Sequence, residues 1–225
     1  YYANSGSEEG LNPGSDYFFH WADRDNEPIN DWKRFTKSLL NIPRAHQLIG
    51  FYTVPDASDG TLKVMRSYQL YAAESISDAV AKSHWTVNDS RGGYIWHTTG
   101  SGKTMTSFKS AQLVAESNHA DKVVFLVDRR ELDAQSLKAY RNFAGSDLTD
   151  EQRDSAVQQT QDCAVLVSKL KSDKVNDKLI VTTIEKMGLV QETAENASDI
   201  TVIRKKRIVF IVDECHRSTF GTMMY

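Results

Sequence analysis

The stretch HTTGSGKT at residues 97–104 has glycines, a lysine and a threonine in the order that phosphate-binding loops use. In such a loop the glycines let backbone N–H groups surround phosphate oxygens, and the helix that follows adds the partial positive charge of its N-terminus. We expect Lys103 to reach the β and γ phosphates of ATP and the Thr104 hydroxyl to bind Mg²⁺. His97 stands where the general motif has its first glycine. The residues expected to contact the nucleotide are Thr99, Gly100, Ser101, Gly102, Lys103 and Thr104.

A second group of candidate residues ends the apolar run RIVFIVDECH at residues 207–216. Such a run is typical of a buried parallel strand, and open α/β sheets bind ligands at the carboxyl ends of their strands. We expect Asp213 to hold Mg²⁺ through its water shell and Glu214 to activate the water that attacks the γ-phosphate. Taken alone, an acidic pair after a strand more often begins a helix. Together with the phosphate loop it predicts a nucleotide-hydrolysing site.

Strand and helix patterns around these two groups predict an α/β fold with a mainly parallel sheet flanked by helices. A helix is expected over residues 62–85, before the phosphate loop, with a second one directly after the loop at 105–117. Further helices are expected at 163–170 and 184–190. The expected strands are residues 92–96, 123–127, 178–183 and the run at 207–216.

The first 60 residues have a different character and predict an α+β appendage. A polar lead-in precedes an aromatic, strand-like stretch at residues 16–26, and helices are expected at 29–40 and 42–53. We take the turn sequence at 55–60 as the boundary with a nucleotide-binding domain at 61–225. The aromatic side chains form either a small satellite core or a docking site for a partner. The lead-in also suggests a piece of a longer polypeptide.

Composition excludes several classes of protein. Of 225 residues, 40% are hydrophobic and 25% are charged, which is enough for one α/β core and an appendage. The net charge of −3 means that any nucleic acid would have to bind a local basic patch. Cys163 and Cys215 have no C-x-x-C spacing, which argues against a disulfide framework or a zinc site. No run is long and apolar enough to span a membrane, and a cytoplasmic protein is predicted.

Three further residues have both a functional and a structural interpretation. Gln69 could read adenine through its amide, or it could be a solvated residue at a helix start. Arg129 follows the expected strand 123–127, where it could contact a DNA phosphate or pair with a neighbouring carboxylate. Thr183 could contact the same backbone or cap the next helix.

Two charged stretches complete the candidates. The basic cluster IRKKR at residues 203–207 directly precedes an apolar strand, so protection of that strand from aggregation is favoured over a DNA contact. The acidic stretch at 144–162 is interpreted as an exposed excursion without chemistry.

The motifs HTTGSGKT, VDRRELDAQ, IVTTIEK and IVDECHRS, in this order, resemble motifs I, Ia, Ib and II of superfamily 2 helicases. The sequence GGYIWHTTGSGKT, with its histidine, and the upstream RSYQ resemble more closely the motor (R) subunit of type I restriction-modification enzymes. The resemblance covers nearly the whole chain. It implies a RecA-like domain that uses ATP and Mg²⁺ to move along double-stranded DNA, with modification and specificity subunits as partners. By the same resemblance, His216 links nucleotide state to the motor, and Arg129 and Thr183 touch DNA.

The resemblance also sets limits. The nuclease domain of that family carries an E-x-K signature, which these 225 residues lack, so this stretch is not expected to cut DNA. The chain ends at Tyr225, before any second RecA-like domain with an arginine finger, so slow ATP hydrolysis is expected from this stretch alone. The alternatives are a DEAD/DEAH-like helicase and a scaffold that keeps the fold without catalysis.

Overall fold

A parallel three-stranded sheet forms the centre of the computed structural model, which describes residues 2–3, 18–58, 60–86, 92–127, 163–192, 197–212 and 215. The central strand is β5 (Lys122–Val127), with β6 (Leu179–Thr183) on one side and β7 (Ile208–Val212) on the other. Val124 is in register with Ile180 of β6 and Phe210 of β7. Every residue of β5 is buried, as expected for an apolar strand covered on both faces. These three strand predictions are confirmed.

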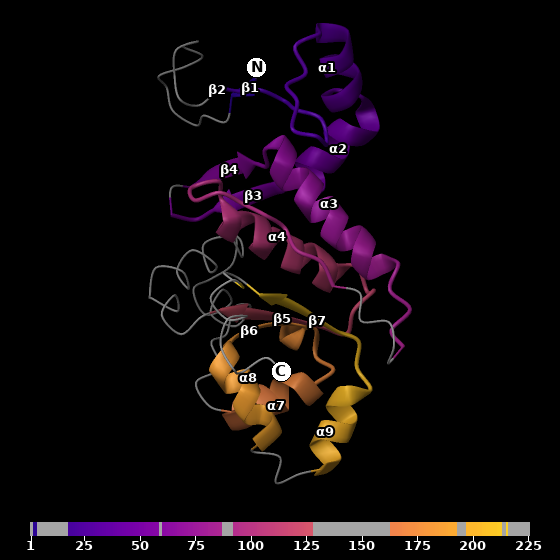
Figure 1. Cartoon of the computed structure of the whole chain (residues 1–225), viewed down its shortest axis with the longest axis vertical. Coiled ribbons are helices and arrows are strands. Elements are labelled where there is room, and N and C mark those ends of the chain that lie inside the picture. The colour runs from indigo at the N-terminus through magenta and orange to yellow at the C-terminus, as the bar shows by residue number, and fades with distance from the viewer. Residues whose placement is uncertain are drawn as a thin grey trace.

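Helices cover both faces of this sheet, as Figure 1 shows. On one face lie α4 (Lys103–Glu116) and, outside it, α3 (Ser67–Ala81). The other face carries α7 (Cys163–Lys171), α8 (Ile184–Glu192) and α9 (Ala197–Arg204), with the short 3-10 helix η1 (Val175–Asp177) before β6. The structure is therefore of the α/β class, with a parallel sheet between helices.

The alternating side chains of β5 join two separate cores, because neighbours on a strand point to opposite faces. Val123, Phe125 and Val127 pack in a cluster with α4 residues such as Phe108 and Val114. On the other face, the cluster contains Val124, Leu126, Leu166, Leu170, Ile180, Val190 and Ile203. The apolar side chains on the two faces of β5 thus hold α4 on one side of the sheet and α7, α8 and α9 on the other.

The N-terminal segment is built from short elements with clear capping signals. Asp31 accepts a hydrogen bond from Arg34 N (2.8 Å) at the start of α1 (Trp32–Leu39). Asn41 accepts one from Arg44 N (3.0 Å) at the start of α2 (Ile42–Phe51). The antiparallel pairs are β1 (Tyr2–Ala3) with β2 (Phe18–Phe19), and β3 (Thr53–Asp56) with β4 (Thr61–Val64).

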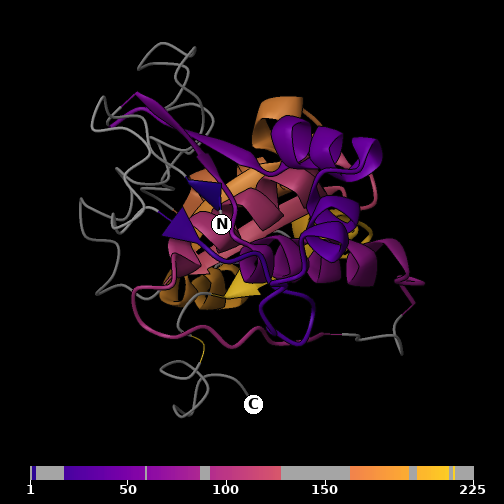
Figure 2. The same cartoon turned by 90° about the horizontal axis from the view of Figure 1, so that it is seen from above.

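A third core connects this segment to α3. Trp21 and Leu39 pack there with residues of the following segment: Met65, Leu70 and Ala73. The β3–β4 hairpin itself crosses residue 60. Figure 2, seen from above, shows α1 and α2 stacked over the helices and sheet below. The division into units 1–60 and 61–225 stays a prediction, and the two sides of residue 60 share this core.

Three expectations about local structure were wrong. Residues 92–98 form no strand. Tyr94 and Trp96 are 83% and 86% exposed, no strand in the described part of the chain pairs with this segment, and Gly92 and Gly93 weaken strand formation. Residues 61–64 form β4, because they pair with β3, and the helix begins only at Ser67. The turn expected at 55–60 is shorter, since β3 continues through Asp56.

Helices α1, α2, α4, α7 and α8 confirm the corresponding predictions within a few residues, whereas α9 was not anticipated. None of the helices in the described ranges has the length and apolar character needed to cross a membrane.

Candidate nucleotide-binding site

The phosphate loop lies directly before α4, with the helix geometry that anion binding requires. Gly100 and Gly102 have positive φ angles of 77° and 80°, which glycine adopts without strain. Gly102 is the N-cap of α4, so Lys103 and Thr104 are the first two residues of the helix. The first N–H groups of a helix have no acceptor within the helix, and together with the partial positive charge there they fit a phosphate group.

The position of the loop relative to the sheet follows from a short connection. Only residues 117–121 lie between α4 and β5, so the helix must run antiparallel to the strand. The start of α4 therefore lies over the carboxyl end of β5. That edge is where open α/β sheets bind their ligands.

Two side chains from the start of α3 hold the loop through one carbonyl oxygen. The Tyr68 hydroxyl donates to Ser101 O at 2.7 Å, and Gln69 Nε2 donates to the same oxygen at 3.1 Å. A Cβ atom added at Gly102 would come within 2.5 Å of Gln69 Nε2. A side chain at position 102 would therefore have to displace the Gln69 amide from Ser101 O, in addition to adopting a positive φ.

The Ser101 side chain is held from the other side by His97. Ser101 Oγ donates its single hydrogen to Thr98 O at 2.7 Å. His97 Nδ1 lies 3.1 Å from Ser101 Oγ, which fits the tautomer in which Nδ1 carries the proton and donates to that oxygen. The His97 ring also meets the Tyr68 ring edge-on, with centroids 5.8 Å apart. The residue in place of the motif's first glycine thus packs within the loop.

Gln69 is a buried residue and not a solvated one, because only 3% of its surface is exposed. Its Oε1 accepts a hydrogen bond from Arg66 N at 2.9 Å, while Nε2 contacts the loop. Both ends of the amide are therefore engaged within the protein. An adenine contact by Gln69 stays a prediction, whereas its contact with the phosphate loop is observed.

Thr183 ends β6 and caps α8. Its Oγ1 accepts a hydrogen bond from Lys186 N at 3.2 Å, and the side chain is buried. This is the capping role that the sequence left open as an alternative. A contact between Thr183 and a DNA phosphate stays a prediction.

The remaining predicted site residues, Arg129, Asp213, Glu214 and His216, lie outside the described residues. Strand β7 is described up to Val212, directly before the acidic pair in the sequence. Within the described ranges, no group of three or more His, Cys, Asp or Glu side chains could hold a metal ion. Of the two predicted metal ligands, Thr104 and Asp213, only Thr104 lies among the described residues. Sequence reasoning missed the loop contacts of Tyr68 and His97, because a hydrogen bond to a distant carbonyl leaves no local pattern.

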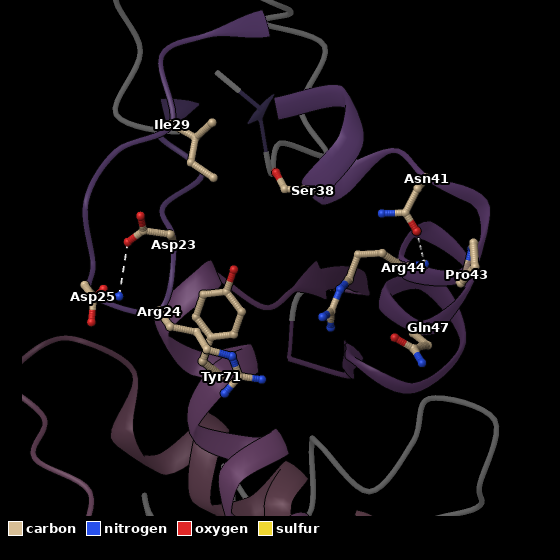
Figure 3. Close-up of a pocket in the computed structure, with 10 residues that line it drawn as sticks. All are labelled: Asp23, Arg24, Asp25, Ile29, Ser38, Asn41, Pro43, Arg44, Gln47 and Tyr71. Carbon is tan, nitrogen blue, oxygen red and sulfur yellow. Dashed lines mark hydrogen bonds between the residues drawn. The ribbon is translucent and has the colours of Figure 1, made fainter. Parts of the chain in front are cut away.

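A separate hollow of about 580 Å³ lies in the N-terminal segment, away from the phosphate loop (Figure 3). Its two arginines, Arg24 and Arg44, both pair with Glu74. Asp23 Oδ1 accepts from the backbone N–H groups of Asp25 and Glu27. Because both arginines pair with Glu74 of α3 and Asp23 closes a turn, this hollow indicates a local polar network rather than the nucleotide site.

Comparison with known proteins identifies the family. The SWI2/SNF2 ATPase family model matches residues 68–225. The match begins at Tyr68, whose hydroxyl donates to Ser101 O of the phosphate loop. The type I restriction enzyme SsaAORF53P endonuclease subunit of Staphylococcus saprophyticus is 38% identical over 92% of this chain. The SauCOLORF180P endonuclease subunit of Staphylococcus aureus has the same identity and coverage. A Mycoplasma pneumoniae protein, named as the C-terminal part of the putative MpnIIP endonuclease subunit, is 39% identical over 90% of this chain and 95% of that protein.

The chain belongs to the type I restriction enzyme endonuclease subunits. Its SWI2/SNF2 match makes it an ATPase-family member of that group, and both findings confirm the resemblance in the motifs. The chain spans about a fifth of the length of the two staphylococcal subunits. The phosphate loop and the three-stranded sheet both lie within residues 68–225, the part of the chain that the ATPase family model matches.

Proposed function

We propose that this chain is the ATP-binding part of the DNA-translocating motor of a type I restriction endonuclease. In this role a RecA-like P-loop domain couples hydrolysis of Mg-ATP to movement along double-stranded DNA. The observation that carries the proposal is the glycine loop held at the start of α4, over the carboxyl edge of a parallel sheet, within an ATPase family.

The proposed roles of the residues follow from this site. Lys103 contacts the β and γ phosphates, and Thr104 and Asp213 bind the magnesium ion that shields the phosphate charges. Glu214 orients the attacking water, and His216 links the nucleotide to the rest of the motor. Thr99, Gly100, Ser101 and Gly102 form the loop, and Gln69 contributes to adenine selection in addition to its observed contact with Ser101.

The proposed partners are double-stranded DNA and the modification and specificity subunits of the restriction complex. Arg129 and Thr183 are the proposed contacts to the DNA backbone, which carry no sequence information. Recognition of the DNA site is therefore assigned to another subunit. The cleavage step belongs to a nuclease domain outside these 225 residues.

The test is an ATPase assay on the assembled complex that contains this polypeptide, with blunt duplex DNA or single-stranded RNA as activator. Stimulation by the duplex, abolished by Lys103→Ala, is expected. Stimulation by RNA alone would instead favour a DEAD/DEAH-like helicase. An ATP affinity that Lys103→Ala leaves unchanged would favour a scaffold without catalysis.

A further inference from the structure

A basic hollow of about 500 Å³ lies at the amino-terminal edge of the sheet, opposite the phosphate loop. Lys122 opens β5, Lys178 directly precedes β6 and Arg207 directly precedes β7. Because the strands are parallel, these three starts lie side by side. The hollow is therefore a consequence of the fold, which brings basic residues from distant parts of the sequence to one edge.

The charges that line this hollow are unbalanced. Six basic residues face two acidic ones, in a chain whose overall net charge is −3. Asp121 is engaged by the guanidinium group of Arg207, and Asp173 pairs with Lys206. Both carboxylates of the hollow thus already have a cationic partner. The other four cations are Lys122, Lys174, Lys178 and Lys205.

Lys122 contributes a buried ammonium group to the wall of the hollow. The residue is 2% exposed, and its Nζ donates to the carbonyl oxygen of Asp177 at 2.7 Å. Burial, followed by repulsion from Lys206, lowers the pKa of Lys122 to about 8, against the opposing effect of nearby carboxylates. Those carboxylates are Asp177, Asp173 and Asp121. The wall of the hollow therefore contains a buried amine that loses its proton more readily than an exposed lysine does.

Capping of helix ends explains part of this basic cluster. Lys206 Nζ donates to Ser172 O at 3.2 Å after α7, and Arg207 Nη2 donates to Asn118 O at 3.3 Å after α4. Lys174 and Lys205 are exposed at the rim and make no such side-chain contact in the described part of the chain. Capping thus leaves Lys174 and Lys205 unexplained. The aggregation-protection hypothesis for residues 203–207 covers Lys205 but not Lys174.

We propose that this hollow binds a small polyphosphate anion, at a site separate from the phosphate loop. Lysine ammonium groups bind phosphate as point charges, and the volume falls in the range of small-ligand sites. Helix α4 has 14 residues and places the two sites about 20 Å apart. Duplex DNA is a convex rod that would reach the rim lysines and leave Lys122 uncontacted. This inference goes beyond the proposed function and does not depend on it.

The first test is calorimetric titration of the protein with inorganic tripolyphosphate in the absence of magnesium. Every protein carries Lys103→Ala, so that the phosphate loop does not contribute to binding. We expect the double variant Lys174→Gln/Lys205→Gln to bind about tenfold more weakly. The matched control, Lys33→Gln/Lys37→Gln, removes the same charge from exposed positions on α1 and should change affinity by less than about twofold. Equal losses in both variants would refute a specific site.

The second readout is proton uptake on binding, measured at pH 8 in buffers of different ionisation enthalpy. A bound anion raises the pKa of Lys122 from about 8, so the protein that retains Lys122 should take up about half a proton more than Lys122→Met, which reports the protons exchanged by the anion itself. Lys122→Met should also bind more weakly. Equal proton exchange in the two proteins would remove Lys122 from the site and overturn the proposal.

The third arm distinguishes a small anion from DNA. The same proteins are titrated with a short duplex, alone and in competition with tripolyphosphate. If the duplex binds through Lys174 and Lys205 while tripolyphosphate neither binds nor competes, the hollow is a DNA-backbone contact and the proposal is wrong. Because Lys103 is absent from all arms, these outcomes are independent of ATP binding at the phosphate loop.

Discussion

The Tyr68 hydroxyl donates a 2.7 Å hydrogen bond to the carbonyl oxygen of Ser101, across 33 residues of sequence. Gln69 donates to the same oxygen at 3.1 Å. The start of α3 and the phosphate loop are therefore one structural unit. This relationship makes loop geometry testable at positions that are not themselves expected to touch phosphate.

Tyr68→Phe should weaken ATP binding by about fivefold, because loss of one hydrogen bond costs about 1 kcal/mol. The melting temperature should change little, since Gln69 still holds Ser101 O. Tyr71→Phe is the matched control: it removes a hydroxyl that donates to Ala22 O at 3.2 Å, one turn along the same helix and away from the loop. Nucleotide affinity is measured by calorimetry. Equal losses in the two variants would show that Tyr68 has no specific role.

Gly102→Ala should weaken ATP binding more than Gly100→Ala does, because the new Cβ meets Gln69 Nε2 at 2.5 Å and would displace it from Ser101 O, at a position where φ is 80°. Gly100→Ala has a similar φ of 77° but open space around the added atom. It should therefore cost only the backbone strain, about 1 kcal/mol. Gly188→Ala in α8 adds the same methyl group where nothing lies within 4 Å and should leave binding unchanged. Binding assays and thermal unfolding of the three variants check this ranking. A Gly102→Ala protein that binds ATP as well as Gly188→Ala does would contradict it.

Thr183→Val should destabilise the protein by about 1 kcal/mol, because it removes the oxygen that caps α8. Thr183→Ser keeps that oxygen and should restore most of the stability, as measured by denaturant unfolding. Duplex affinity of the assembled complex then separates the two roles. Thr183→Asp also keeps a capping oxygen but would repel a DNA phosphate, so normal duplex affinity in that variant would show that the cap alone accounts for the residue.

Lys122 should make stability rise with pH between about 8 and 10.5. Its pKa in the folded protein is about 8, below the ordinary value of 10.5, so the unfolded chain binds more protons in this window. The destabilising effect of charging the buried amine is fully present below pH 8 and disappears above pH 10.5. Denaturant unfolding at pH 7 and pH 10 should show a smaller pH-dependent gain for Lys122→Met than for the native chain. An identical gain in both would contradict the lowered pKa.

Local sequence patterns were sufficient for the elements that depend on neighbouring residues. The runs that became β5, β6 and β7 are continuous and apolar, and a strand buried on both faces requires that pattern. The glycines at 100 and 102 likewise predicted a loop, since both occupy the left-handed region. The same reasoning failed for residues 92–96, because an apolar segment forms a strand only if a partner pairs with it.

The sequence by itself determined the family, the phosphate loop, the three parallel strands and the helix that follows the loop, because each depends on residue types at short spacing. Only the tertiary structure decided that Tyr68, Gln69 and His97 converge on Ser101, and that basic residues at the starts of three separate strands meet at one edge. Such contacts arise when packing of the cores and parallel strand pairing bring distant segments together. The directions of helices and strands then decide which side chains meet.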